Sequence, residues 1–184
     1  MKATLIAGSP QDGSHTLALV REIGERLREQ DIEVSIWDLA EHPLPPFEVP
    51  FHKDHSIITN HEALCFLEEL NTADMVVLGT PLYHGSYSGL LKNALDYLMK
   101  DQLFEKPVGL VVNGGGNTKN AQALNHLTTI VHTLYGVPMQ TQIGTHGPDY
   151  DQTDDGFVVS NDDIKDRCDR LAKEMVRFAK ALKQ

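Results

Sequence analysis

Most residues that could do chemistry lie in three glycine-containing segments, each of which directly follows an apolar run. The first segment, residues 8–16, reads Gly-Ser-Pro-Gln-Asp-Gly-Ser-His-Thr and leads into a helical pattern near Leu17. Hydroxyl groups and free backbone N–H groups at a helix start are typical of a phosphate-binding turn that requires neither Lys nor Arg. The segment is neither a Walker loop nor a Gly-x-Gly-x-x-Gly dinucleotide motif. An ordinary strand–helix turn capped by a serine is the alternative interpretation.

The second segment, residues 79–89, places Tyr83 and His84 among small residues and continues as Leu-Leu-Lys-Asn-Ala-Leu-Asp-Tyr. A planar ring could lie against Tyr83 or Pro81, with backbone N–H and hydroxyl groups meeting its polar edge. No carboxylate close in the sequence would orient His84 as a general acid, so we interpret it as a contact to a ligand or a partner subunit. Tyr97 is expected to pack inside the protein.

The third segment is Asn-Gly-Gly-Gly at residues 113–116, again before a helical pattern. Consecutive glycines at a strand end indicate a close approach to the backbone or positive φ angles, and a merely flexible loop is the alternative. Open parallel sheets bind ligands beyond the carboxyl ends of their strands, near the point where strand order reverses. Because the three segments follow the first, third and fourth predicted strands, we expect them to form one ligand site.

Five β-type segments are predicted, at residues 3–7, 33–37, 75–78, 108–112 and 138–143. Three of them are nearly continuous apolar runs, as in strands buried on both faces, whereas residues 33–37 alternate like an edge strand. Helical patterns separate the strands, and a clear apolar stripe marks residues 164–182. The order predicts a three-layer, flavodoxin-like α/β fold with a five-stranded parallel sheet, order 2-1-3-4-5, and helices on both faces. Residues 1–184 are expected to form a single domain, with proline-rich residues 40–54 as a surface loop.

The charge balance excludes several partners. The chain has 26 acidic and 16 basic residues, a net charge of −10, which argues against a nucleic-acid-binding face and against binding to an anionic membrane. No apolar run approaches the roughly 20 residues that span a bilayer, and residues 3–7 are too short for a signal peptide. We therefore expect a cytoplasmic protein.

No metal site is predicted. Cys65 and Cys168 lack metal-ligand spacing and are interpreted as thiols inside the helical core. Three histidines near the proline-rich stretch are interpreted as solvated surface, namely His52, His55 and His61.

The chain resembles the NAD(P)H-dependent FMN reductases of flavodoxin-like fold in motifs that occur in the same order over residues 1 to about 180. These motifs are Gly8-Ser-Pro-x-x-Gly-Ser-x-Thr16, Gly79-Thr-Pro-x-Tyr83, Gly85-Ser-Tyr-Ser-Gly-x-Leu-Lys-Asn-Ala-Leu-Asp96 and Asn113-Gly-Gly-Gly116. The resemblance implies a non-covalent FMN. It implies cofactor-binding residues at the phosphate (Ser9, Gln11, Ser14, His15, Thr16), along the ring (Pro81, Leu82, Tyr83, His84, Gly85, Ser86) and at the pyrimidine side (Asn113, Gly114, Gly115).

One departure from the family pattern is Gln11, where many relatives have an Arg after Gly-Ser-Pro. Without that cation, phosphate affinity is expected to be weaker or to depend on backbone donors. Negative charge near the pyrimidine ring would be stabilised by N–H groups of residues 114–116 and by the following helix start.

The function implied by the resemblance is hydride transfer from NADPH or NADH to the flavin N5 atom and onward to a small-molecule acceptor. The flavin supplies the difficult chemistry, so no catalytic side chain is predicted. Family members are commonly dimers or tetramers, which implies a homodimer or homotetramer. Three alternatives stay open: an FMN-dependent reductase of quinones, azo compounds, nitroaromatics or metal oxyanions; a flavodoxin-like electron carrier; and a related module without flavin.

Overall fold

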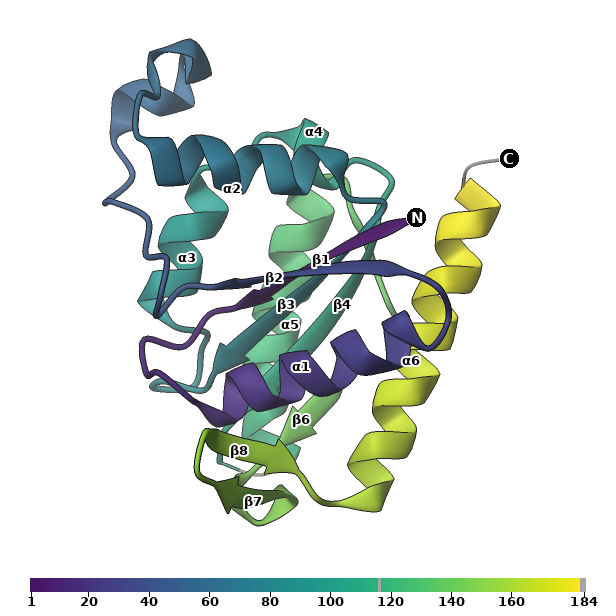
Figure 1. Ribbon diagram of the computed structural model, residues 1–184. Coiled ribbons are helices and arrows are strands. Elements are labelled where there is room, and N and C mark those ends of the chain that lie inside the picture. Colours follow the sequence, from purple (N-terminus) through teal and green to yellow (C-terminus); the bar gives the residue numbers. More distant parts are fainter. Residues whose placement is uncertain (116, 183–184) are drawn as a thin grey trace.

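The computed structural model describes residues 1–115 and 117–182, and its centre is a parallel sheet (Figure 1). The strand order is β2-β1-β3-β4-β5, and β6 also pairs with β4. This is the order of flavodoxin-like folds, so the predicted fold class is confirmed. The strands are β1 (Lys2–Ala7), β2 (Glu33–Asp38), β3 (Met75–Pro81), β4 (Pro107–Asn113), β5 (Val137–Pro138) and β6 (Ile143–Thr145).

Helices cover both faces of the sheet. In Figure 1, α1 and α6 lie on one face, and α2, α3 and α5 lie on the other. No helix among the described residues is both long and apolar enough to cross a bilayer. The helices are α1 (His15–Arg28), α2 (His61–Thr72), α3 (Gly89–Asp96), α4 (Lys100–Leu103), α5 (Asn117–Thr133) and α6 (Asp162–Leu182).

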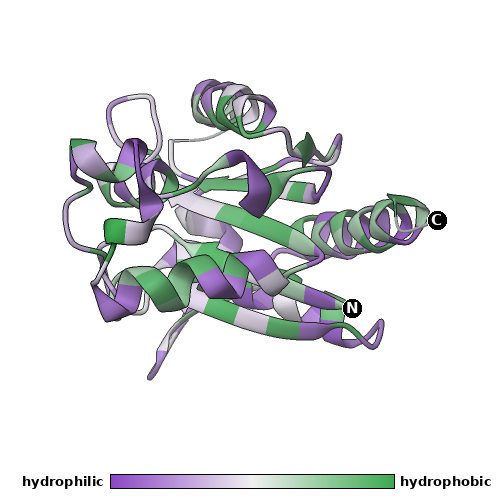
Figure 2. Ribbon diagram, turned by 90° about the horizontal axis from the view of Figure 1, so that it is seen from above, coloured by the Kyte–Doolittle hydropathy of each residue, from purple (hydrophilic) through white to green (hydrophobic). Residues whose placement is uncertain are grey.

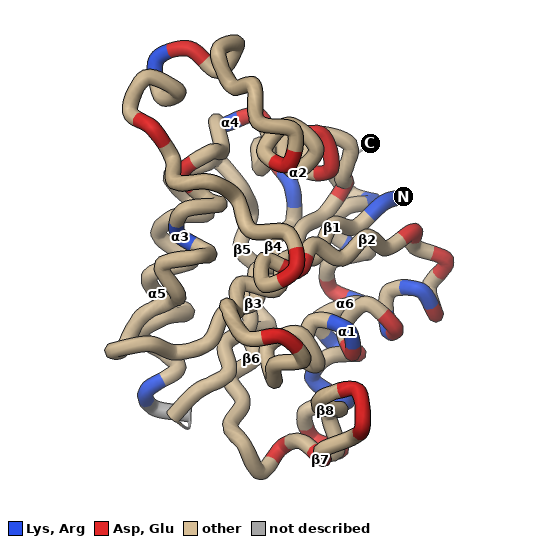
Figure 3. Tube along the Cα trace, turned by 60° about the vertical axis from the view of Figure 1, so that its left-hand side comes forward, with Lys and Arg blue, Asp and Glu red and all other residues tan. Residues whose placement is uncertain are grey.

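The core consists of two apolar layers, one on each face of the sheet. The predicted stripe of α6 contributes buried Ile164, Cys168, Leu171 and Met175 to one layer. Figure 2 shows hydrophilic and hydrophobic colours mixed along the helix that leads to the C-terminus, and Figure 3 shows charges spread along α1 and α6. The expectation of two core thiols is only partly met, because Cys65 is half-buried and its Sγ lies near the His61 ring.

The proline-rich stretch is anchored to α3. Asn93 Oδ1 accepts a hydrogen bond from Phe47 N at 2.8 Å, and the hydroxyl of buried Tyr97 donates to Pro45 O at 3.0 Å. Short 3-10 turns follow, at Val49–His52 and His55–Ile57. Asn93 and Tyr97, both in the Lys-Asn-Ala-Leu-Asp-Tyr run, therefore have a structural role, because they hold this loop by hydrogen bonds.

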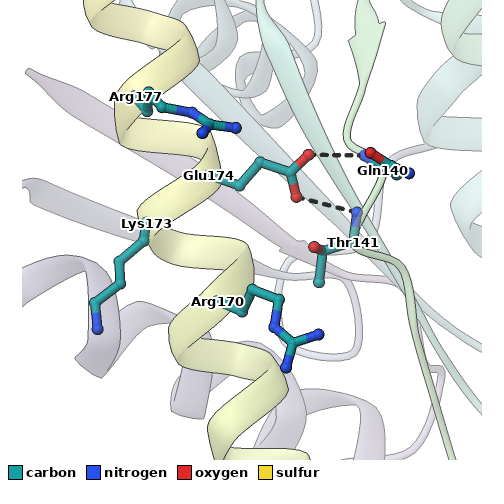
Figure 4. Close-up of a pocket in the computed structure, with 6 residues that line it drawn as sticks. All are labelled: Gln140, Thr141, Arg170, Lys173, Glu174 and Arg177. Atoms are coloured by element: carbon teal, nitrogen blue, oxygen red, sulfur yellow. Dashed lines mark hydrogen bonds between the residues drawn. The ribbon is translucent and has the colours of Figure 1, made fainter.

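The prediction of one strand over residues 138–143 is wrong. Val137–Pro138 and Ile143–Thr145 form two short strands that pair with opposite ends of β4. Between them, the Glu174 carboxylate accepts hydrogen bonds from the backbone N–H groups of Gln140 and Thr141, both at 3.0 Å (Figure 4). A side chain of α6 thus satisfies the donors that a continuous strand would have used in its ladder.

After β6, the chain forms a β-hairpin that was not predicted from the sequence. Its strands, β7 (Tyr150–Thr153) and β8 (Gly156–Val159), are antiparallel and joined by two aspartates. The hairpin lies beside the start of α1, as Figure 1 shows. Gly156, with φ +117°, lies so close to Gly13 that a Cβ at position 156 would come within 2.8 Å of Gly13 O.

Candidate functional site

The three predicted segments meet at the carboxyl-terminal edge of the sheet. Residues 8–16 follow β1, residues 82–88 follow β3 and residues 114–115 follow β4, and these strands are neighbours. Gly8 N donates to Gly79 O at 2.8 Å, and Leu82 N donates to Asn113 O at 2.8 Å. Backbone hydrogen bonds therefore continue past the sheet and join the three loops into one surface.

Buried Ser88 connects the first loop to the second by hydrogen bonds. Its hydroxyl donates to Gly8 O and accepts from Leu91 N, while its backbone N donates to Thr80 Oγ1 at 2.9 Å. The same hydroxyl thus caps α3 and fixes the backbone at the start of the phosphate-loop candidate. Ser88 lies inside a predicted family motif but was assigned no role from the sequence, although a serine directly before a helical pattern is a capping signal.

The first loop ends in a capped helix. Ser14 is the N-cap of α1, and its hydroxyl accepts from Leu17 N at 3.1 Å. Ser9 Oγ accepts from Gln11 N at 3.1 Å. Ser9, Ser14 and Thr16 are buried, whereas the Gln11 side chain is exposed. The serine hydroxyls shape the loop, and the positive end of the helix dipole lies beside it.

Carboxylates outnumber cations near this loop. Burial raises the pKa of Asp38 and repulsion from Asp12 and Glu41 raises it further, whereas the hydrogen bond from Ala40 N and the charge of Arg21 on α1 oppose the shift. Burial lowers the pKa of His15, which favours the neutral imidazole. Residues 8–16 contain no Lys or Arg. An anion bound here would be held by neutral donors and by the helix start.

The second loop contains a tight two-residue turn. Tyr83 and Ser86 exchange backbone hydrogen bonds of 2.9 and 3.0 Å across His84 and Gly85. The φ angles of His84 and Gly85 are +49° and +81°, as a type I′ turn requires. A histidine in the left-handed region is strained, and such strain often marks a functional site. Tyr83 and His84 are exposed.

This turn rests on α5. Ser86 Oγ lies 3.0 Å from His126 Nδ1, and the Tyr87 ring meets the His126 ring edge-on at 6.3 Å. A Cβ on Gly85 would lie 3.0 Å from Gln122 Oε1. His126 and Gln122 were missed by sequence reasoning, because both lie inside a helix and belong to no motif.

The third loop approaches the second very closely. Gly114 N donates to Thr145 O at 2.9 Å. A Cβ at position 114 would lie 2.2 Å from Leu82 Cβ, so no larger residue fits without movement. A Cβ on exposed Gly115 would come within 2.9 Å of the Lys119 side chain only. The expected role of the Gly116 N–H concerns a position outside the described residues.

Thr145, at the end of β6, organises this loop. Its carbonyl also accepts from Asn120 Nδ2 at 2.9 Å, and its hydroxyl donates to Asn113 Oδ1 at 3.2 Å. The amide oxygen of buried Asn120, Oδ1, has no hydrogen-bond partner among the described residues. It would lie 3.0 Å from a Cβ at position 114.

The residues at this edge fit FMN. The strained turn and the crowded glycine suit close contact between backbone and a flat ring, and the helix start suits the phosphate. The hollow in Figure 4, lined by residues of α6 and by Gln140 and Thr141, involves none of the three loops. No group of three or more His, Cys, Asp or Glu residues able to hold a metal ion occurs in the described part of the chain.

Similar proteins are found both among known sequences and among solved structures. A family model described as NADPH-dependent FMN reductase matches residues 1–147. The FMN-dependent NADPH-azoreductase of Staphylococcus saprophyticus is 39% identical over 181 residues, which cover 98% of this chain and 96% of the relative. Among solved structures, the flavoenzyme FerB, an NAD(P)H:(acceptor) oxidoreductase of Paracoccus denitrificans, superposes with a TM-score of 0.74 at 19% identity, covering 96% of this chain and 98% of FerB. A flavodoxin from the domain Archaea superposes with a TM-score of 0.65 at 15% identity, with 100% of both chains covered. These two structures share the fold.

Proposed function

Because the chain belongs to the NADPH-dependent FMN reductase family and is an NAD(P)H-dependent oxidoreductase that uses FMN, we propose that it reduces azo compounds with a tightly held FMN. The observation that supports this most is the meeting of three loops at one sheet edge, each adapted to a different part of the cofactor. The 39% identity to an azoreductase over nearly the whole chain supports the choice of acceptor.

Each loop has a proposed task. In residues 8–16, the backbone N–H groups and the hydroxyls of Ser9, Ser14 and Thr16 bind the phosphate, and Gln11 and His15 border it. In residues 81–86, the tight turn lies along the ring, and Pro81 and Leu82 form the floor beneath it. Asn113, Gly114 and Gly115 contact the pyrimidine side. Geometry supports these tasks because the three loops are hydrogen-bonded to one another.

The chemistry that bound FMN would supply here is the transfer of electrons from NADPH to the second substrate. The chain's own residues position the ring and leave its approach open. Tyr83, which is 45% exposed, and His84 border that approach and are placed to contact the nicotinamide or the acceptor. We name no general acid or base, because neither the sequence nor the site geometry identifies one.

Anaerobic steady-state kinetics test the function. The FMN-loaded protein is mixed with NADPH and the azo dye methyl red, and both NADPH absorbance at 340 nm and dye colour are followed. We expect two NADPH oxidised for each azo bond cleaved to two amines, because cleavage takes four electrons, and parallel double-reciprocal lines, the pattern of a flavin that stays bound between half-reactions. Intersecting lines, with activity proportional to added free FMN, would instead indicate that FMN is a released substrate. Absence of NADPH oxidation would favour the electron-carrier alternative.

The molecular context is also proposed. We infer that residues 1–184 act as one domain in a cytoplasmic homodimer or homotetramer. An apolar hollow between α3 and α5, lined in part by Leu95, Leu98, Ile130 and Leu134, supports self-association. Light scattering during gel filtration measures the mass of the assembly, and a mass of one chain would contradict this proposal.

A further inference from the structure

We propose that the β7–β8 hairpin is a clasp that sets the positions of both ends of the flavin site, with Tyr150 and Phe157 as its positioning residues. This role presupposes the flavin site of the proposed function. The hairpin begins after residue 147, where the match to the family model ends, so the clasp belongs to a part of the chain that the family match does not cover.

At the phosphate end, Phe157 stacks on His15. The ring centroids are 3.8 Å apart and the planes differ by 21°. His15 is the first residue of α1, directly after the capping Ser14. Next to this stack, Gly156 lies against the backbone of Gly13. The backbone and one aromatic ring of β8 thus cover the outer side of the phosphate loop and restrict its movement.

At the ring end, Tyr150 reaches the support of the glycine loop. Its hydroxyl lies 2.6 Å from Thr145 Oγ1. Burial raises the pKa of Tyr150, so this hydroxyl stays protonated and can donate. Thr145 in turn holds Asn113 through its hydroxyl and the Gly114 N–H through its carbonyl. The support for the third loop therefore depends on a residue of the hairpin.

Tyr150 also joins the two ends. The edge of its ring meets His15 at a centroid distance of 4.7 Å and an interplanar angle of 65°. One buried side chain thus touches both the helix start at the phosphate loop and the residue that holds the glycine loop. A loop that is ordered before the ligand arrives does not lose that conformational freedom on binding, so the clasp raises affinity without touching the cofactor.

Three variants distinguish the contributions of the hairpin to the phosphate end and to the ring end of the flavin site. Tyr150→Phe keeps the ring and removes only the hydroxyl, and Phe157→Leu keeps apolar volume and removes the stack. Val158→Ala is the matched control, because Val158 lies on the same strand and is 48% exposed. Dissociation constants for FMN and for riboflavin, which lacks the phosphate, are measured by quenching of flavin fluorescence. Urea unfolding of each apoprotein measures stability.

The two positioning residues have different expected signatures. Loss of one hydrogen bond in Tyr150→Phe is expected to weaken FMN and riboflavin binding by about the same factor, roughly fivefold. Loss of the stack in Phe157→Leu is expected to weaken FMN by about fivefold and riboflavin much less, because the defect lies at the phosphate end. Val158→Ala is expected to bind both flavins as the wild-type protein does.

A hairpin with a purely structural role would give a different result. Lower stability together with unchanged dissociation constants for both flavins in Tyr150→Phe and Phe157→Leu would overturn the clasp and leave the proposed function intact. If the wild-type protein bound no flavin, the proposed function would fall. In that case amide hydrogen exchange of the apoproteins tests the clasp by itself. Exchange rates at residues 8–16 and 113–115 that are the same in both variants as in the wild-type protein would overturn the clasp as well.

Discussion

Neighbouring glycines in the third loop have different physical tasks. Gly114 is a packing glycine, since its Cβ would overlap Leu82 and crowd Asn120. Gly115 is exposed, and its Cβ would come close only to the flexible side chain of Lys119, with Leu82 Cδ2 at an ordinary contact distance of 3.9 Å. The sequence presents these positions as equivalent members of one Gly-Gly-Gly run, and only the fold distinguishes them.

Gly114→Ala is therefore expected to destabilise the protein by about 1–3 kcal/mol, the usual cost of overpacking a tight site. Gly115→Ala is the control, with an expected change within about 0.5 kcal/mol, as for other surface positions. Urea denaturation of the apoproteins measures both. Equal stability of the two variants would contradict the distinction.

Gly115→Val tests ligand contact at an exposed position. A valine there leaves the core untouched but projects side-chain atoms into the space assigned to the ring. We expect unchanged unfolding by urea and FMN affinity weakened by at least about tenfold, because steric overlap at a tight contact costs more than about 1.4 kcal/mol. Gly89→Ala, at the same sheet edge but with open space around its Cβ, should bind FMN normally. Normal binding by Gly115→Val would place the ring elsewhere.

Elements were predictable where one local pattern decides the structure. The strands over residues 3–7, 75–78 and 108–112 are apolar runs, and all three lie in the sheet within one to three residues of the predicted ends. The strand over residues 138–143 was not predictable, because Glu174, more than 30 positions away, interrupts it. The hairpin did have a local signal, Asp-Asp-Gly between β-type residues, but both strands are only four residues long and the first of them is mostly polar.

The same contrast holds for the candidate site. Gly-Ser-Pro and Asn-Gly-Gly-Gly could be found because glycine, serine and proline leave a visible pattern. Thr145, Asn120 and Tyr150 could not be found, since their roles arise from contacts between separate elements. Motifs identify residues that approach a ligand through their backbone, whereas the residues that support those loops need the tertiary structure.

The hairpin is anchored at its base by Asp149. One carboxylate oxygen accepts from Asn161 Nδ2 at 2.8 Å, and the other accepts from His146 N at 2.9 Å and lies 2.8 Å from His146 Nδ1. Burial by itself would raise the pKa of Asp149, but these hydrogen bonds outweigh it and hold the pKa below its ordinary value. The carboxylate thus stabilises the fold in its ionised form.

The sign of the pH dependence follows from that shift. Since the folded-state pKa is lower than the unfolded-state value, the stabilisation is complete above the unfolded-state pKa of about 4 and is lost as pH falls below it. Asp149→Asn is expected to cost about 2 kcal/mol of unfolding free energy at pH 7, as for hydrogen bonds to a charged group. Urea titrations at pH 5 and pH 3.5, a range in which the carboxylate changes its charge, should show this difference shrinking at the lower pH. A difference that stays constant or grows would show that ionised Asp149 is not the stabilising form.

At the scale of the whole molecule, the net charge of −10 opposes the binding of a phosphate. The phosphate loop itself contributes Asp12, and residues 152–157 of the hairpin line the same hollow as residues 11–13. The turn aspartates, Asp154 and Asp155, are therefore close enough to act on a dianionic phosphate at low salt. Figure 3 shows acidic residues on this hairpin. Affinity must come from short-range neutral donors that overcome a repulsive long-range field.

This balance predicts an unusual salt response. Screening should tighten FMN binding by roughly twofold or more between 20 and 300 mM NaCl, because the Debye length falls from about 20 Å to about 6 Å. Riboflavin has no phosphate, so its affinity should stay nearly constant over the same range. Replacing both Asp154 and Asp155 with Asn should tighten FMN binding at 20 mM NaCl and flatten the salt dependence. Weaker FMN binding at high salt would mean that cations hold the phosphate. Because residues 8–16 contain no Arg or Lys, such a cation would have to come from another segment or from a second copy of the chain.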